Sequence, residues 1–176
     1  LGPGETHDVF IAVPDAAWSA QAGSAGLKAW RGGCGQKAFD HAIATLRRRI
    51  TRVRFDLPEG VAREGAATFH TAAGQILINR DGPALQPGPR RYTRSWIRDG
   101  AIMGAALLRA GDVTAMASFV RWYARHQRPD GFVPCCVDRD GPDPLVEHDS
   151  HGQWVFAVME SFRFDGDRDR LVALWP

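Results

Sequence analysis

Apolar residues recur at three- and four-residue steps along much of this chain, and that spacing is typical of amphipathic α-helices. The first such pattern covers residues 36–54 and the second covers residues 62–79. Each is followed by residues that disfavour helix, "DLPEG" after the first and the proline- and glycine-rich "RDGPALQPGPRR" after the second. The pattern therefore predicts two helices in the first half of the chain.

The second half shows the same spacing in four further segments, which cover residues 100–110, 113–127, 150–164 and 168–176. Small residues interleave with large apolar ones in the first of these, so a neighbouring helix can approach it closely. Gly111 suits the end of that helix, and Asp112 suits the N-cap of the next. Residues 134–149 are rich in proline and aspartate and have no helical period, so they are predicted as a loop. Asp149 or Ser150 would cap the helix that follows.

Gly-Asp turns divide these helices into repeating hairpins. Gly111-Asp112 and Gly166-Asp167 lie 55 positions apart (111 to 166), and each joins one helix to the next. A helical hairpin cannot bury both of its faces alone, so such repeats stack into a solenoid or close into a ring. In a ring the polar residues ahead of each inner helix converge. They are Arg98 and Asp99 for one hairpin and Glu147, His148 and Asp149 for the next.

The N-terminal part has a different character. An apolar run within residues 6–13, ended by Pro14, indicates a short strand, and the glycine-rich residues after it indicate loop. We expect residues 1–35 to form an irregular or β segment and residues 36–176 to form a domain of helical hairpins. The predicted fold class is all-α.

Composition narrows the classes of function. The chain has 22 Lys and Arg residues against 20 Asp and Glu, a net charge of +2, so nucleic acid is not an expected partner. The basic cluster at residues 46–54 is interrupted by apolar residues and is interpreted as a solvated helix face. No apolar run of about 18 residues and no signal-peptide pattern occurs, so we expect a soluble, cytoplasmic protein with no membrane partner.

Cysteine usage agrees with a reducing compartment. The cysteines are Cys34, Cys135 and Cys136. Their odd number leaves a thiol unpaired, and a bond between the adjacent two would be strained. A zinc site that adds His148 and His151 is disfavoured, because adjacent cysteines rarely bind one ion together. We expect no cofactor, although a divalent ion in the aspartate-rich loop at residues 138–143 stays open.

Several short motifs occur together in the second half of the chain. They are "YxxxWxRDGA" from Tyr92, "ALLRAG" from Ala106, "QxxDG" from Gln127 and "DSHGQ" from Asp149. In this order and at hairpin spacing they resemble the six-hairpin, glucoamylase-like glycoside hydrolases, whose fold is an (α/α)6 toroid. The resemblance covers residues 92–176 and implies that the helical hairpins form part of such a toroid.

The resemblance also implies roles for particular residues. In that family an Arg-Asp pair at a loop-to-helix junction holds the hydroxyls of one sugar ring, and here that pair is Arg98 and Asp99. A guanidinium that donates hydrogen bonds and a carboxylate that accepts them suit a pyranose, because each of its hydroxyls can both accept and donate. Trp96 and Tyr92 would add flat apolar faces. The remaining residues expected at the same pocket are Glu147, His148 and Asp149, with His151 as an alternative neutral hydrogen-bonding partner.

The implied function is exo-acting hydrolysis of α-glucosidic or related sugar linkages. Inversion needs an acid and a base about 6.5–9.5 Å apart. In the family pattern both come from inner helices beyond the point that corresponds to residues 171–176. We therefore expect this chain to carry sugar-binding groups but not the catalytic acid and base, whose identity stays unknown.

Other roles remain open for the same residues. Asp99 and Asp149 each suit a helix N-cap, Arg98 a surface cation and Trp96 a core position. The chain is alternatively a noncatalytic carbohydrate-binding helical module, or a polysaccharide lyase or sugar epimerase of toroid type. Candidate groups for the last two reactions are His148, His151 and Tyr92.

An open arc of hairpins would leave apolar surface without a partner, and exposed apolar patches promote association. We therefore expect a homo-oligomer, or further C-terminal hairpins, as a partner. The residues expected at that surface are Trp154, Phe156, Leu171 and Trp175.

Overall fold

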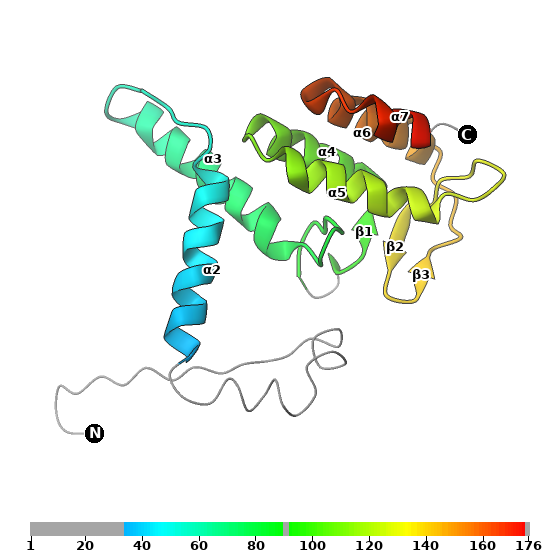
Figure 1. Ribbon diagram of the computed structural model, residues 1–176, viewed down its shortest axis with the longest axis horizontal. Helices are drawn as coiled ribbons and strands as arrows, with labels where there is room; N and C mark the ends of the chain where they lie inside the picture. Colours follow the sequence, from blue (N-terminus) through cyan, green and yellow to red (C-terminus); the bar gives the residue numbers. More distant parts are fainter. Residues whose placement is uncertain (1–33, 90–91, 175–176) are drawn as a thin grey trace. The chain divides into compact units, whose positions relative to one another are not determined.

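The computed structural model describes residues 34–89 and 92–174 (Figure 1). The strand predicted at residues 6–13 therefore lies outside the described residues, and so does Trp175. The chain divides into two compact units, Leu1–Arg47 and Arg48–Pro176. The described part of the first unit belongs to helix α2, which spans Cys34–Ile50. The domain boundary expected at residue 35 stays a prediction.

The second unit is mainly helical, as predicted. Beyond the end of α2 its helices are α3 (Val61–Asn79), α4 (Ile97–Arg109), α5 (Val113–Tyr123), the short 3-10 helix η2 (Ala124–His126), α6 (Ser150–Asp165) and α7 (Arg168–Ala173). Some boundaries differ from the prediction. Helix α2 stops at Ile50 instead of Arg54, and α4 begins at Ile97, which places Arg98 and Asp99 inside its first turn.

A small antiparallel sheet joins two loops and departs from the all-α prediction. Its strands are β1 (Ser95–Trp96), β2 (Cys136–Asp138) and β3 (Gly141–Pro142), in that order. Trp96 pairs with Cys136 across β1 and β2. The prediction of loop throughout residues 134–149 was wrong for β2 and β3, because strands this short show no detectable alternation of apolar and polar residues. The sheet ties the segment before α4 to the segment before α6.

The core lies where α4, α5 and α6 pack together. Small residues of α4 let α5 come close, as the sequence indicated. A Cβ atom on Gly100 would overlap the Phe119 ring, and one on Gly104 would overlap the Met116 sulfur. The largest fully buried side chains of this region include Ile97, Leu107, Leu108, Met116, Phe119, Val120 and Tyr123.

The predicted repeat of helical hairpins is confirmed by its two turns. Gly111 and Gly166 both adopt positive φ, 82° and 65°, at the ends of α4 and α6. Asp112 then accepts a hydrogen bond from the Ala115 amide at 3.3 Å, and Asp167 accepts one from the Arg170 amide at 2.9 Å. Each turn therefore ends one helix and caps the next by the same device.

Ion pairs at both ends show that α4 and α6 run parallel to each other. Arg98 in the first turn of α4 pairs with Asp149, which directly precedes α6. Arg109 at the end of α4 pairs with Glu160 in the second half of α6, at 2.9 Å. Helices α5 and α7 return in the opposite direction (Figure 1). The two hairpins therefore begin at the same end of the unit.

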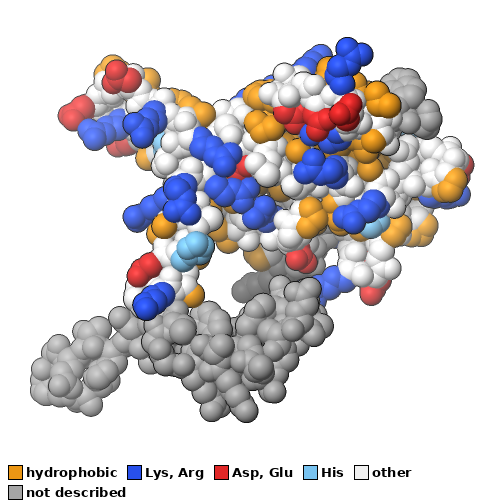
Figure 2. Space-filling view, viewed as in Figure 1, with side chains coloured by type: hydrophobic (Ala, Val, Ile, Leu, Met, Phe, Trp, Pro, Cys, Tyr) orange, Lys and Arg blue, Asp and Glu red, His pale blue; other side chains and the backbone are white. Residues whose placement is uncertain are grey.

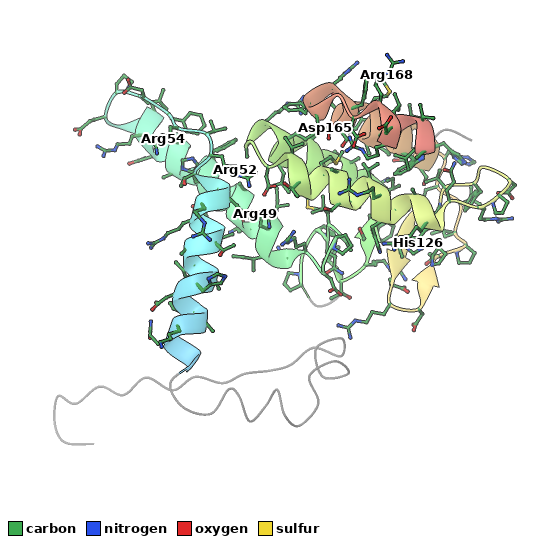
Figure 3. The ribbon with its side chains drawn as sticks, viewed as in Figure 1. Arg49, Arg52, Arg54, His126, Asp165 and Arg168 are labelled. Carbon is green, nitrogen blue, oxygen red and sulfur yellow. The ribbon has the colours of Figure 1, made fainter. Side chains whose placement is uncertain are left out.

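The basic cluster at residues 46–54 is only partly solvated. Arg49 Nε lies 2.6 Å from the buried Asp112 carboxylate, and Arg52 donates to the Gly111 carbonyl at 2.9 Å (Figure 3). Figure 2 shows the basic side chains gathered around the end of α2. The interpretation as a solvated face was therefore wrong for Arg49, which is 19% exposed, because the buried Asp112 needs a counter-charge, whereas Arg52 stays exposed.

The apolar surface expected on the last hairpin is present in part. Trp154 is buried, contrary to expectation, and its ring lies 6.0 Å from that of Tyr123. Phe156 is 40% exposed, and Leu171 is half-buried. Among the described helices, none is both long and apolar enough to cross a membrane.

Candidate functional site

Three charged side chains meet where α4 and α6 begin. Arg98 Nη1 donates to Asp149 Oδ2 at 2.9 Å and to Glu147 Oε2 at 3.2 Å. The three side chains remain accessible, with 45% of Arg98, 42% of Asp149 and 26% of Glu147 exposed. The predicted convergence of polar residues from consecutive hairpins is therefore present in the structure for these three.

Helix electrostatics explain why Arg98 needs these carboxylates. The N-terminal end of a helix carries a partial positive charge that disfavours a cation in its first turn and favours an anion. The hydrogen bond with Asp149, followed by the charges of Asp149, Glu147 and Asp99, raises the pKa of Arg98 above its ordinary value. The cluster therefore holds a permanent guanidinium against three carboxylates.

Asp149 does not cap α6 with its side chain, contrary to one of the expected roles. It occupies the N-cap position, but its carboxylate is directed to Arg98, and only its backbone carbonyl accepts from Gln153 N, at 2.9 Å. Ser150 at the next position is fully buried, and its hydroxyl has no hydrogen-bonding partner among the described residues. The Asp149 carboxylate therefore pairs with Arg98 and leaves the first turn of α6 without a side-chain cap.

Asp99 is not an N-cap either. Trp96 occupies the N-cap position of α4, and Asp99 follows within the first turn. Its side chain is half-buried, and in the described part of the chain it has no hydrogen bond or ion pair of its own. A carboxylate without a partner next to a guanidinium can accept hydrogen bonds from a ligand.

Within residues 34–89 and 92–174, the remaining predicted site residues make no hydrogen bond or ion pair with Arg98. Tyr92 is 63% exposed. Trp96 is half-buried, and the Arg94 guanidinium lies 5.6 Å from its ring centre. His148 is exposed, and His151 accepts a long hydrogen bond of 3.4 Å from Val133 N.

Arg94 organises the loops beside the site, and the sequence analysis did not identify it. Its guanidinium donates to Asp138 at 2.9 Å and to Asp143 at 3.0 Å, and it lies 3.4 Å from Cys136 Sγ. Two of the three loop aspartates that were considered for a divalent ion, Asp138 and Asp143, are thus paired with a cation. Among the residues that the structure describes, no group of three or more His, Cys, Asp or Glu side chains is arranged to hold a metal ion.

Two adjacent thiols stand at the start of β2, whose partner strand β1 directly precedes α4. Cys135 and Cys136 are free and each is 1% exposed, and their sulfur atoms are 3.3 Å apart. Burial raises the pKa of Cys135, and burial together with the neighbouring thiol raises the pKa of Cys136 to about 12. Both are therefore thiols at neutral pH.

An apolar cavity of about 260 Å³ is lined by the last hairpin and Gln127, and Arg98 is not among its lining residues. Its lining residues are Gln127, Trp154, Val155, Val158, Met159, Leu171 and Leu174. None of these carries a charge, so the cavity has no group suited to acid or base chemistry.

Comparisons with known protein families, with curated proteins and with solved structures found no match to this chain.

Proposed function

We propose that this chain is the sugar-binding part of a glucoamylase-like glycoside hydrolase with an (α/α)6 toroid, which acts on α-glucosidic or related linkages. The observation that carries the proposal is the meeting of Arg98, Glu147 and Asp149 at the shared end of the parallel helices α4 and α6, with Asp99 beside them. Parallel inner helices that begin at one end are what a ring of hairpins requires.

The cluster has donors and acceptors left for a sugar. A guanidinium has five N–H groups, and the printed contacts of Arg98 use Nη1 alone. Asp99 contributes a carboxylate with no partner among the described residues, and Asp149 and Glu147 each keep one oxygen outside the contact with Arg98. Vicinal hydroxyls donate to carboxylates and accept from guanidinium groups, so one ring is held in one orientation.

The same geometry favours binding over acid-base catalysis at this cluster. Glu147 and Asp149 share one guanidinium as hydrogen-bond acceptors, whereas a general acid must donate a proton to the leaving group of the substrate. We propose that the acid and base of the hydrolase belong to other inner helices. A noncatalytic carbohydrate-binding module is the second candidate, because it needs only this binding cluster.

Calorimetric titration of the chain with glucose, maltose and galactose tests the binding proposal. We expect heat of binding for a glucose-containing sugar, and at least about a tenfold loss of affinity in Asp99→Asn, which keeps the size of the side chain. Arg128→Met removes an exposed ion pair with Asp130 elsewhere on the surface and serves as the matched control. Unchanged sugar affinity in Asp99→Asn and Arg98→Met would refute the site.

An activity measurement separates the two candidates. We expect no release of glucose from maltose or an aryl α-glucoside by this chain alone, and release by a polypeptide extended through the remaining hairpins of a toroid. Release by this chain alone would contradict the assignment of acid and base to other helices. Sugar binding without release in any extended polypeptide would establish the noncatalytic module.

A further inference from the structure

Cys135 and Cys136 are positioned toward each other in a way that a regular strand does not allow. Successive side chains of a β-strand point to opposite faces of the sheet. Here Cys136 begins β2, Cys135 directly precedes it, and their sulfur atoms nevertheless lie 3.3 Å apart. The backbone at this junction therefore departs from strand geometry and brings the two thiols together on one side.

We propose that Cys135 and Cys136 form an oxidation site, at which a hydroperoxide closes the two thiols into a vicinal disulfide that displaces the start of α4. The proposal does not depend on the sugar-binding role of the chain. Its basis is the contact between the two sulfur atoms, the position of Arg94 and the hydrogen bond that links this pair to Ile97.

The reaction balances with hydrogen peroxide as the oxidant. Both groups are thiols at neutral pH, and Arg94 Nη1, 3.4 Å from Cys136 Sγ, stabilises the thiolate when that proton leaves, so Cys136 makes the first attack. The peroxide O–O bond breaks, one oxygen stays on Cys136 as a sulfenic acid, and the other leaves as water. Cys135 sulfur then attacks Cys136 sulfur, and the S–O bond breaks to release a second water. Two thiols lose two hydrogens and two electrons, and peroxide is reduced to water.

The connection to α4 passes through one amide group. The ring of a vicinal disulfide contains the peptide bond between the two cysteines, so closing the ring reorients that peptide. The carbonyl of Cys135 belongs to it, and this carbonyl accepts the hydrogen bond of Ile97 N at 2.9 Å. Ile97 is the first residue of α4 and directly precedes Arg98. Oxidation is therefore expected to break the bond that anchors the beginning of α4.

The disulfide is expected to be reversible. Adjacent Cα atoms are about 3.8 Å apart, less than the usual range of about 4.4–6.8 Å for bridged cysteines. Strained disulfides are reduced readily and are the labile ones. Because burial raises the pKa of both thiols, oxidation is slow at neutral pH, and the oxidised form marks prolonged exposure to peroxide.

The test uses the whole chain carrying Cys34→Ala, which leaves only the adjacent pair. After incubation with hydrogen peroxide in native buffer, peptide mass mapping is expected to show a disulfide between Cys135 and Cys136 that dithiothreitol reverses. Hydrogen exchange at the Ile97 amide is expected to accelerate on the order of tenfold, the effect of losing one hydrogen bond. Exchange at Ala115, whose amide bonds to Asp112 in the next turn, is the internal control.

The other outcomes each overturn the proposal. A pair that stays reduced in the folded protein and oxidises only in denaturant shows that the site is inaccessible. Sulfinic acid, or a disulfide between two molecules, shows that the ring does not close. A vicinal disulfide with unchanged exchange at Ile97 shows that oxidation does not reach α4.

Discussion

Arg98 and Asp149 form an ion pair across 51 positions of sequence, and the same separation joins Arg109 to Glu160 at the far end of the same two helices. Equal separations at both ends mean that α4 and α6 run side by side in constant register. The first turns of both helices are thereby brought to one place. The position of the candidate site is thus a consequence of the repeat.

Replacing Arg98 by methionine tests whether the cluster binds or stabilises. The side chain is 45% exposed, and exposed ion pairs contribute about 0–1 kcal/mol to stability. We expect the unfolding free energy in urea to change by less than about 1 kcal/mol while sugar affinity is lost. Arg98→Lys keeps the charge but loses the planar array of donors, so we expect weakened binding in that variant.

The outcome that contradicts this prediction is a large loss of stability together with unaltered binding. That result would make Arg98 a structural residue of the α4 and α6 junction.

Gly100 and Gly104 determine how closely α4 approaches α5. A methyl group at Gly100 would meet the Phe119 ring, and one at Gly104 the Met116 sulfur. We expect Gly100→Ala to lower the unfolding free energy by about 1–3 kcal/mol, the usual cost of overpacking. The loss in Gly104→Ala should be smaller, because the Met116 side chain is flexible and can move.

Gly65 in α3 provides the matched control for these two variants. It is a helical glycine with no atom within 4 Å of an added Cβ. Gly65→Ala should stabilise the protein by up to about 1 kcal/mol through helix propensity alone. If all three variants gave the same change, close packing of α4 would not be the cause.

Local signals in the sequence were enough to predict the turns but not the partners of the charged groups. Gly111 and Asp112 act within a few residues of chain, and glycine at positive φ followed by a capping aspartate is a strong local pattern. Asp149 shows the limit of such patterns. Its position predicted an N-cap, but its carboxylate accepts a hydrogen bond from Arg98, 51 positions away, and does not cap the helix.

The same limit explains why Arg94 and the small sheet were not predicted. Strands of two or three residues are too short to show an alternation of apolar and polar residues. Arg94 reaches Asp138 and Asp143 only because of the register in which β1 pairs with β2. The sugar-binding assignment of Tyr92, Trp96 and His148 stays a prediction, because in the described part of the chain none of them forms a hydrogen bond with Arg98.

Asp112 should matter far more to stability than its counterpart in the second hairpin. It is 1% exposed, caps α5 and pairs with Arg49 and Arg52, whereas the side chain of Asp167 is 40% exposed. We expect Asp112→Asn to lower the unfolding free energy by about 2–3 kcal/mol, because partly buried arginines lose their counter-charge. Asp167→Asn should cost less than about 1 kcal/mol, since asparagine also caps helices and Arg170, the ion-pair partner of Asp167, keeps its second counter-charge Asp165. Equal losses in urea unfolding would show that only the caps matter.

Stability should fall in acid because of carboxylates on α6. The ion pair with Arg109, against the opposing effect of burial, and the hydrogen bond with Arg163 hold the pKa of Glu160 below its ordinary value. Burial raises the pKa of Asp165, but the hydrogen bonds from Arg170 and from the Asp167 amide outweigh it and lower that pKa as well. Asp165 is labelled on its helix in Figure 3. A carboxyl with a lowered pKa in the folded state contributes stability above the unfolded pKa of about 4, and this stability is lost as pH falls through the folded pKa.

The urea midpoint should therefore be flat from pH 7 to about 5 and decline below about pH 4. Glu160→Gln should be less stable at pH 7 and show a shallower decline, and an identical decline in that variant would assign the acid sensitivity to other groups.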